Sequence, residues 1–379
     1  MRVFCGFHNS KSDKESEMRM SKNKLTCIDL FCGCGGLSLG FQTAGFDVIA
    51  GIDSWKDALV THKKNMPYAI TINENLFTFS PHDCERKYGI SKVDVIVGGP
   101  PCQGFSIAGK RILNDERNKL YKSFVEFVNY YKPRAFVMEN VPNLLSLSGG
   151  IVRDEILKDF NDIGYEVSFK VLTASDYGVP QNRRRVFFVG LNKKEKKDFV
   201  FPCPSYGVDG TPYVSCSDAI SDLDFIGDLD LLPEKAMYKI PAQSEYQRKV
   251  RKNSRFLLNH VATIHTEQTR KIIGLVPDGG NYKDLPIELR DTRKVHIAWT
   301  RMRSDKPCFT IDCGHNHHFH YSANRVPTVR EAARIQSFPD TFEFIGIKTS
   351  QLKQVGNAVP PMMANAVATS LINILQGEI

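Results

Sequence analysis

The 379-residue chain lacks any long apolar run, and no stretch approaches the roughly 18 apolar residues that a membrane-spanning helix needs. Its N-terminus lacks the apolar core of a signal peptide. The ten cysteines are scattered singly, so we expect reduced thiols in the cytoplasm rather than a disulfide framework. Internal repeats are also lacking. With 42% hydrophobic residues and 42.8 kDa, the composition predicts one large globular domain plus a smaller one.

The charge is unevenly distributed, with a net formal charge of +8. Residues 215–241 carry six acidic residues against two lysines, whereas residues 245–303 carry thirteen Lys or Arg against six acids. Taken alone, the basic segment is typical of a solvated face. Beside a catalytic domain, it favours contact with nucleic acid.

The regular pattern begins after a polar segment, residues 1–22, which we expect to be a mobile tail in which Met18 or Met20 is an alternative start. Beyond it, strand-like runs alternate with helical ones. The six candidate strands are residues 25–31, 47–53, 93–99, 134–141, 165–172 and 185–191. This alternation predicts an α/β fold with an open, mostly parallel sheet that has helices on both faces.

The alternation of strand-like and helical runs ends after residue 191, and a regular pattern resumes near Pro327. We therefore predict a first domain at 23–191, a loop-rich second domain at 192–325, and a segment at 326–379 that completes the first domain. The helix expected at "TVREAARIQSF" begins with Thr and stops at Pro339.

A glycine-rich turn, "DLFCGCGG" (29–36), follows the first strand and opens a helix. Such a turn allows a ligand to approach the backbone closely. The GxGxxG spacing of a nicotinamide or flavin site is absent. Asp53 ends the second strand, where it suits either a ribose hydroxyl or the start of the next helix. These features indicate a cofactor that contains a nucleoside.

Cys102 lies in "GGPPCQGFS" (98–106), directly after a buried strand. A buried structural thiol is the common fate of a free cysteine. However, the rigid Pro-Pro turn before it and the glycine-containing loop after it are typical of a nucleophile that is presented to a substrate.

Two further blocks place polar residues at strand ends. Glu139 ends the strand after Cys102, and "QNRRR" (181–185) puts Gln181, Arg183 and Arg185 on one face of an extended segment. A surface strand with ion pairs is the plain alternative. Two cations beside a thiol lower its pKa and hold phosphate or a carbonyl oxygen.

These blocks together resemble the C5-cytosine DNA methyltransferases of bacterial restriction-modification systems. The resemblance rests on "DLFCGCGG", Asp53, "GGPPCQGFS", "ENV" and "QNRRR", followed by "RVPTVREAARIQSFPD" and "QVGNAVPP", and covers most of residues 25–375. It implies a Rossmann-like domain that binds S-adenosylmethionine (AdoMet), and a target-recognition domain at about 192–325.

The resemblance also implies catalytic roles. Cys102 would attack C6 of a cytosine flipped out of the duplex, and Glu139 would bind N3 and the exocyclic amine. Arg185 would hold the cytosine O2 and Arg183 the neighbouring phosphate. The loop from Ser106 to Arg111 would close over the base.

Nine positions correspond to residues that hold AdoMet in the family: eight match, namely Phe31, Cys34, Gly36, Asp53, Pro101, Leu120, Asn357 and Ala358, and the ninth is Asn75. Two positions depart from the pattern. Asn75 stands where the family has Asp for the adenine amine, and Ser54 stands where a bulky residue is commoner, with Trp55 next to it. Both departures concern cofactor affinity and leave the chemistry intact.

Double-stranded DNA is the expected partner, since a basic target-recognition domain reads base edges while phosphate contacts position it. We expect DNA contacts from Ser106, Gln181, Arg183, Arg248, Arg251 and Arg255. A monomer is expected, with a cognate restriction endonuclease as its functional partner and no membrane association.

Four alternatives concern the same motifs. Two Cys and four His in residues 308–321 suggest zinc, but their spacing is irregular, so we expect no metal. "CFT" (308–310) also occurs in the tRNA-methylating branch of the family, which leaves tRNA as an alternative substrate. A nicotinamide oxidoreductase leaves Pro-Pro-Cys-Gln unexplained, and a catalytically silent relative would lack Cys102, Glu139 or Arg185.

Overall fold

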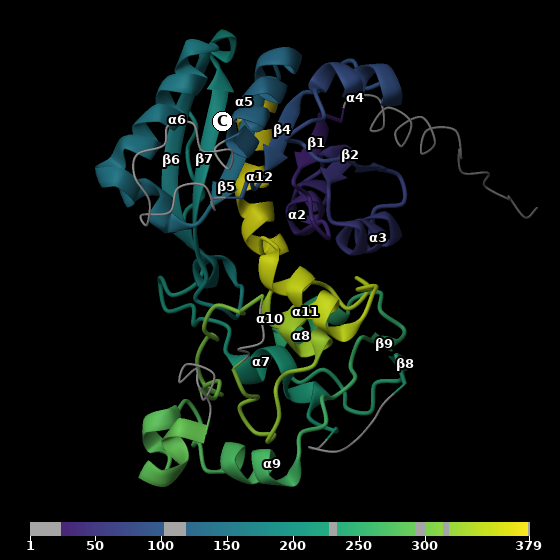
Figure 1. Cartoon of the computed structure of the whole chain (residues 1–379), viewed down its shortest axis with the longest axis vertical. Coiled ribbons are helices and arrows are strands. Elements are labelled where there is room, and N and C mark those ends of the chain that lie inside the picture. Colours follow the sequence, from purple (N-terminus) through teal and green to yellow (C-terminus); the bar gives the residue numbers. More distant parts are fainter. Residues whose placement is uncertain (1–23, 102–118, 227–232, 293–299, 314–317, 378–379) are drawn as a thin grey trace, which may run out of the picture.

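A computed structural model describes residues 24–101, 119–226, 233–292, 300–313 and 318–377. They form a lobe built around a β-sheet and a second lobe made largely of loops and short helices (Figure 1). The predicted N-terminal tail, Cys102 and Ser106 lie outside the described residues.

The sheet has seven strands in the order β3-β2-β1-β4-β5-β7-β6. Their bounds are β1 (Thr26–Leu30), β2 (Asp47–Asp53), β3 (Ile70–Asn73), β4 (Val95–Gly98), β5 (Ala135–Asn140), β6 (Tyr165–Thr173) and β7 (Arg184–Asn192). The five strands from β3 to β5 pair in parallel, whereas β7 is antiparallel to both of its neighbours. The predicted open, mostly parallel sheet is confirmed.

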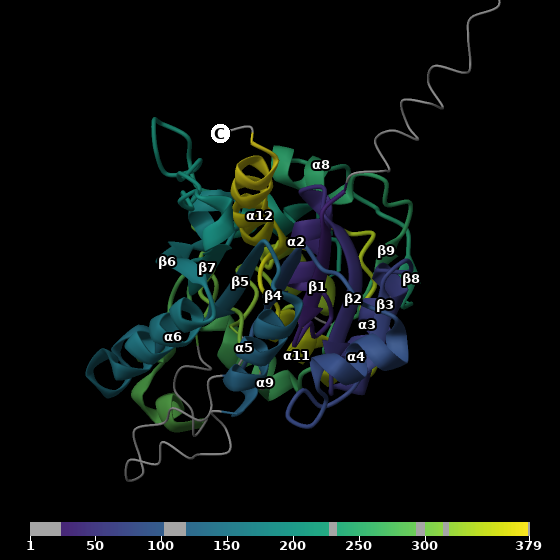
Figure 2. The same cartoon turned by 90° about the horizontal axis from the view of Figure 1, so that it is seen from above.

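Helices cover both faces of this sheet. The helices of this lobe are α2 (Gly36–Thr43), α3 (Lys56–Asn65), α4 (Pro81–Tyr88), α5 (Lys119–Tyr131), α6 (Ile151–Asp162) and α12 (Pro361–Gln376). Figure 2 shows α2 and α12 on one face and α4, α5 and α6 on the other. Alternation along the strands explains this, because successive side chains point to opposite faces. Val95 and Val97 pack toward α2 and α12, while Ile96 between them packs toward α5.

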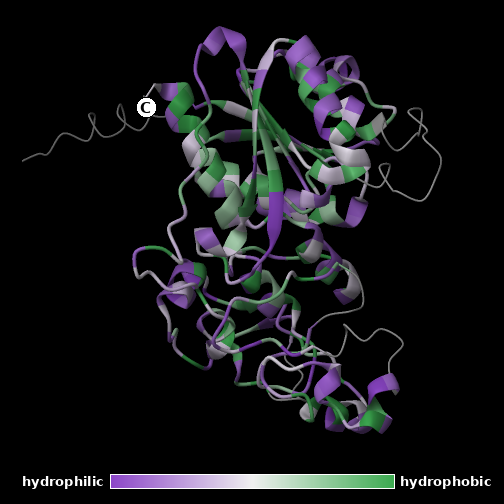
Figure 3. Cartoon of the chain, turned by 90° about the vertical axis from the view of Figure 1, so that its left-hand side faces the viewer, coloured by the Kyte–Doolittle hydropathy of each residue, from purple (hydrophilic) through white to green (hydrophobic). Residues whose placement is uncertain are grey.

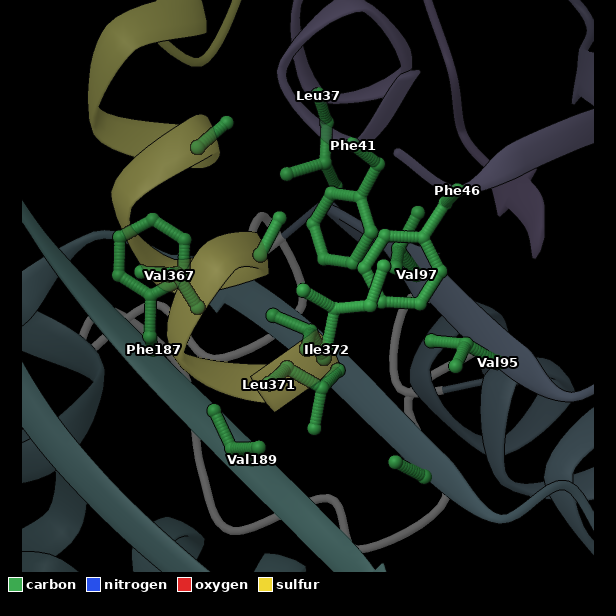
Figure 4. Close-up of a cluster of buried hydrophobic side chains, with 14 of the residues drawn as sticks. Leu37, Phe41, Phe46, Val95, Val97, Phe187, Val189, Val367, Leu371 and Ile372 are labelled. Atoms are coloured by element: carbon green, nitrogen blue, oxygen red, sulfur yellow. The ribbon is translucent and has the colours of Figure 1, made fainter. Parts of the chain in front are cut away.

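The face under α12 holds a dense apolar cluster (Figure 4). Phe41 of α2, Leu371 of α12 and Phe187 of β7 are all fully buried in it. Gly40 allows the two helices to meet, because a Cβ at this position would lie 2.4 Å from that of Ala364. Residues 348–376 are long and apolar enough to be a candidate membrane span, but 67% of the apolar window is buried here, as in a core helix.

The second lobe contains five helices and one small sheet among its described residues. They are α7 (Cys216–Ile220), α8 (Glu245–Arg251), α9 (Glu267–Gly274), α10 (Val329–Ile335), α11 (Lys348–Asn357) and the antiparallel pair β8 (Lys235–Ala236) and β9 (Leu257–Leu258). Short 3-10 segments complete the chain: η3 (Pro142–Gly150), η4 (Ala174–Tyr177), η5 (Lys193–Glu195), η6 (Ser221–Leu223), η7 (Tyr282–Asp284) and η8 (Ile287–Thr292). This lobe mixes hydrophilic and hydrophobic segments, whereas the strands of the sheet are mostly hydrophobic (Figure 3).

The C-terminal segment contacts both lobes, and the domain boundary expected at residue 326 stays a prediction. Helices α10 and α11 share a buried apolar cluster with α7 and α8 of the second lobe. The Ile345 N–H and the Ser350 hydroxyl also donate to Thr61 and Asp57 of α3, and α12 packs against the sheet itself (Figure 1). The helix predicted at "TVREAARIQSF" is α10, and Thr328 caps it in a capping box with Glu331.

Candidate active site

A cavity of about 800 Å³ lies at the carboxyl ends of the parallel strands, where segments of the second lobe close it. It is the place where ligands bind in open α/β sheets. All of the predicted catalytic and cofactor residues that the structure describes line it: Phe31, Cys34, Gly36, Asp53, Asn75, Pro101, Leu120, Glu139, Arg183, Arg185, Asn357 and Ala358. Residues far apart in sequence therefore meet in one space.

The backbone conformation of Phe31 and hydrogen bonds to Asp53 fix the shape of the turn after β1. Phe31 adopts a φ of 61°, a left-handed conformation that is uncommon for a residue with a side chain. The carboxylate of Asp53 accepts hydrogen bonds from the backbone N–H groups of Gly33 (2.9 Å) and Trp55 (2.8 Å). Each oxygen retains acceptor capacity, so Asp53 can fix the turn and still bind a hydroxyl group.

The C-terminal segment closes this end of the cavity. A Cβ on Gly36 would lie 2.4 Å from the carbonyl oxygen of Val359, so glycine is required where the first turn meets Asn357 and Ala358. The Cys34 thiol contacts the Gln354 carbonyl oxygen at 3.6 Å. Burial raises the pKa of Cys34 to about 12, which keeps it a thiol and excludes it as a nucleophile at neutral pH.

Asn75 lies at one of the two positions where the sequence departs from the family pattern, and Trp55 lies next to the other, Ser54. Both residues line the cavity. The Asn75 side-chain oxygen already accepts a hydrogen bond from the Phe77 N–H (3.0 Å), which leaves one lone pair for a ligand. The ammonium group of Lys353 lies 5.0 Å from the centre of the Trp55 ring.

A buried polar cluster beneath the first turn escaped the sequence prediction. Asp29 accepts a hydrogen bond from the Ser38 hydroxyl (2.5 Å), which lies 3.3 Å from His62 Nε2. Burial raises the pKa of Asp29 to about 7 and lowers that of His62 to about 4. The other oxygen of Asp29 has no hydrogen-bond partner among the described residues. "DLFCGCGG" contains Asp29, but nothing in the motif reveals its partners.

Glu139 and Arg185 form the opposite end of the cavity. Arg185 Nε lies 2.9 Å from Glu139 Oε1. Burial raises the pKa of Glu139, although the nearby guanidinium groups of Arg185 and Arg183 act to lower it. Gly99 leaves room beside the carboxylate, because a Cβ there would lie 3.2 Å from Oε2. The arrangement presents a carboxyl group that holds a proton more readily than an exposed glutamate does.

Asn140 is a positioning residue that the sequence analysis did not single out. Its side-chain N–H group donates to the Pro100 carbonyl oxygen (2.9 Å), and its side-chain oxygen accepts from the Val141 N–H (2.9 Å). It therefore ties the Pro-Pro turn that leads to Cys102 to the strand that carries Glu139. The "ENV" motif was the available signal.

Arg183 lines the cavity but is only 2% exposed. Burial and the neighbouring Arg185 lower its pKa to about 9. Its Nε has no hydrogen-bond partner among the described residues, so this arginine has a donor available for a ligand.

Gln181 does not lie where DNA can reach it, which contradicts its predicted role. It is completely buried, and its side-chain oxygen accepts from the Ile311 N–H (3.0 Å). Its side-chain N–H group donates to Gln336 and to the Ile335 carbonyl oxygen. The alternation along "QNRRR" is broken because Gln181 precedes β7 and pairs with Cys308 of the second lobe.

The three predicted DNA-binding arginines of the second lobe differ from one another. Arg251 turns inward, where its guanidinium donates to Asp222 (2.7 Å) and the Ile240 carbonyl oxygen (2.9 Å). The acidic stretch thus neutralises part of the basic one, contrary to the DNA role predicted for Arg251. Arg248 and Arg255 are exposed, and their contact with DNA stays a prediction.

The described residues contain no group of three His, Cys, Asp or Glu side chains that could hold a metal ion. Cys308 is buried beside Cys216, and burial together with that neighbour raises its pKa. The absence of a metal stays a prediction.

Comparison with known proteins identifies the family. The profile described as C-5 cytosine-specific DNA methylase matches residues 25–373. The chain belongs to this family. Among its relatives, the type II methyltransferase M1.HphI of Haemophilus parahaemolyticus is 39% identical over 357 residues, which cover 93% of this chain and 88% of that protein. M.DdeI of Desulfomicrobium norvegicum is also 39% identical, over an alignment that covers 91% of this chain and 88% of that protein.

Solved structures agree with this assignment. A prophage-encoded E. coli protein described as a DNA modification methyltransferase superimposes with a TM-score of 0.79 at 28% identity, covering 93% of this chain and all of that one. A DNMT2 variant of Spodoptera frugiperda (TM-score 0.58, 16% identity, 93% and 100% covered) shows the fold alone. The predicted resemblance to the C5-cytosine methylases, and the enzyme class DNA (cytosine-5) methyltransferase, are confirmed.

Proposed function

We propose that this methylase transfers a methyl group from AdoMet to C5 of a flipped cytosine within a short DNA sequence, through a covalent bond between Cys102 and C6. One observation carries the proposal. A single cavity is lined at one end by the glycine-rich turn and Asp53, and at the other by the Glu139–Arg185 pair. A cofactor and a base bound at these two ends would face each other.

The residues present fit AdoMet. Its size suits a cavity of about 800 Å³. Asp53 retains acceptor capacity for the ribose hydroxyls, and Asn75 for the adenine amine. Phe31, Cys34, Gly36, Pro101, Leu120, Asn357 and Ala358 would surround the rest of the molecule. Bound AdoMet would supply an electrophilic methyl group.

The protein's own groups would activate the cytosine. The Cys102 thiolate forms a bond to C6, while the carboxyl proton of Glu139 goes to N3 and draws electrons away from the ring. The raised pKa of Glu139 supports this step, because burial favours the protonated form of this carboxyl group. After C5 is methylated, loss of the C5 proton restores the double bond and expels the Cys102 thiolate, and N3 returns its proton to Glu139. Arg185 and Arg183 would hold the base oxygen and the adjacent phosphate.

The biological setting we propose is protection of host DNA in a restriction-modification system, with a cognate endonuclease as functional partner. The curated relatives named above are type II methyltransferases. The proposed active form is a monomer, in which both lobes of the chain line the cavity. Methylation of tRNA is the alternative. "CFT" motivated it, but Cys308 is 1% exposed and pairs with Gln181, which gives it a structural role.

A trapping experiment tests the mechanism. Duplexes with a randomised region that carries 5-fluorocytosine in place of cytosine would be incubated with purified protein and AdoMet. Fluorine cannot leave C5 as a proton does, so the Cys102–C6 bond persists, and a complex stable to denaturation should form. Cys102→Ala should form none. A complex of equal yield with Cys102→Ala would contradict the proposed nucleophile.

A further inference from the structure

A chain of buried side-chain amides connects the two ends of the cavity. Gln336 ends helix α10, is completely buried, and donates to the carbonyl oxygen of Ala358 (2.5 Å). Its side-chain oxygen accepts from Gln181, whose own oxygen accepts from the Ile311 N–H (3.0 Å). Both Ala358 and Ile311 line the cavity. Ala358 lies at the cofactor end, and Ile311 belongs to the second lobe.

The two ends of this chain of hydrogen bonds fix the direction in which its members donate. A backbone N–H can only donate and a backbone C=O can only accept, so each glutamine amide has one satisfactory orientation. A change at Gln181 therefore leaves the buried Ile311 N–H unpaired, and a change at Gln336 leaves the Ala358 carbonyl oxygen unpaired. Buried networks that are fully satisfied in this way hold a single arrangement.

Attachment of the two segments does not explain the glutamines. The backbone already joins Asn182 N–H to the Cys308 carbonyl oxygen (2.8 Å) and Cys308 N–H to the Pro180 carbonyl oxygen (2.9 Å). What the side chains add is the link from this junction to Ala358. The junction lies directly before Arg183, at the base end of the cavity.

We propose that Gln181 and Gln336 are positioning residues that couple the cofactor end of the cavity to Arg183 and to the second-lobe segment at residues 308–313. The proposal rests on AdoMet binding as proposed above. Binding at the cofactor end would fix Ala358, and the amide chain would pass that ordering to the residues that face the base and the DNA. The role predicted for Gln181 as a DNA contact is replaced by one that acts through its neighbours.

Hydrogen–deuterium exchange tests this without measuring catalysis. The probe is S-adenosylhomocysteine, the demethylated product, which is added to the full-length protein. Calorimetry measures its binding to the protein. In the wild type, we expect it to protect residues 352–359 and also residues 308–313 and 181–186. We call the protection of residues 308–313 and 181–186 remote protection, and in the wild type we expect it to slow exchange by about fivefold or more. In Gln181→Met and in Gln336→Met, residues 352–359 should still be protected, while the protection factor of the remote residues should fall to about one.

Gln247→Met is the matched control, because Gln247 is also completely buried and hydrogen-bonded within the second lobe. It should leave the remote protection unchanged. The double variant should match either single one, since both interrupt one chain. If Gln181→Met does not fold, Gln336→Met interrupts the chain from the other side. Unchanged remote protection in the variants would overturn the coupling alone. A wild type that binds no S-adenosylhomocysteine would overturn the proposed function and the coupling with it.

Discussion

At the scale of single residues, Glu139 combines burial with two neighbouring cations. Burial raises its pKa while Arg185 keeps it oriented at 2.9 Å. We expect Glu139→Gln to slow methyl transfer to DNA by about 100- to 10,000-fold, because an amide cannot deliver a proton to N3. Transfer of tritiated methyl groups measures this. Glu166→Gln, at an exposed position on β6, should retain wild-type activity, and a similar rate in both variants would contradict the role of Glu139.

Asp29 gives a residue-scale prediction about pH. Its pKa is raised from 3.8 to about 7, so the folded protein holds the proton more tightly than the unfolded chain does. The stability from this protonated carboxyl is fully present below pH 4 and is lost as the pH rises through 7. Between pH 5 and 7.5, the free energy of unfolding of the wild type should fall by about 2–3 kcal/mol relative to Asp29→Asn.

Urea denaturation of both proteins across this range measures the difference. His62, with its pKa lowered to about 4, acts in the opposite direction but is common to both proteins. Parallel stability curves would show that Asp29 titrates as an exposed carboxyl does.

The residue scale is also where sequence patterns were least reliable. Glu139, Arg183 and Arg185 were singled out from residue type and spacing, whereas most of the cofactor positions that line the cavity followed from the family resemblance. Gln181 and Arg251 were assigned to DNA from their neighbours in sequence. Their partners, Gln336 and Asp222, are 155 and 29 residues away, and no local pattern reveals them.

At the scale of elements, most strand positions and the mostly parallel sheet were predictable, whereas β3 and the antiparallel pairing of β7 were not. Residues 47–53 were expected as a strand and form β2, because apolar residues end there at Asp53. The four residues of β3 were missed, since so short an edge strand carries little pattern. The antiparallel pairing of β7 depends on which strands meet in space, and periodicity within a strand contains no such information.

Helix α10 provides the element-scale prediction. All seven of its residues are buried, including Arg334, which donates to Asp222 and makes two hydrogen bonds to Asp340 (2.7 and 2.9 Å). Arg334→Met would remove the cation that the buried carboxylates of Asp222 and Asp340 share, which leaves them with Arg251 and with the more distant Arg330 (3.8 Å). We expect it to cost about 3–5 kcal/mol of the free energy of unfolding.

Thermal or urea unfolding measures this cost. Lys271→Met is the matched control, because its ion pair with Glu267 is largely exposed, and it should change stability little. Equal stability of the two variants would show that the buried ion pairs do not hold α10 in place.

At the scale of the whole molecule, some of the basic side chains that contribute to the net charge of +8 face inward. Asp222 of the acidic stretch neutralises Arg251 and Arg334, whereas Arg248 and Arg255 remain exposed. We expect DNA affinity to fall about a thousandfold between 50 and 200 mM salt if some six phosphates are contacted. Fluorescence anisotropy at several salt concentrations measures the slope. Arg248→Gln and Arg255→Gln should each reduce it by about one, whereas a slope that neither variant changes would place the DNA surface elsewhere.

The most direct test of the account is methylation mapping at base resolution. DNA and tRNA would be taken from a methylation-free host that expresses either this chain or its Cys102→Ala variant. The account predicts 5-methylcytosine at one short DNA sequence with the wild type and none with the variant. Methylation confined to tRNA, or DNA methylation that persists in Cys102→Ala, would contradict it.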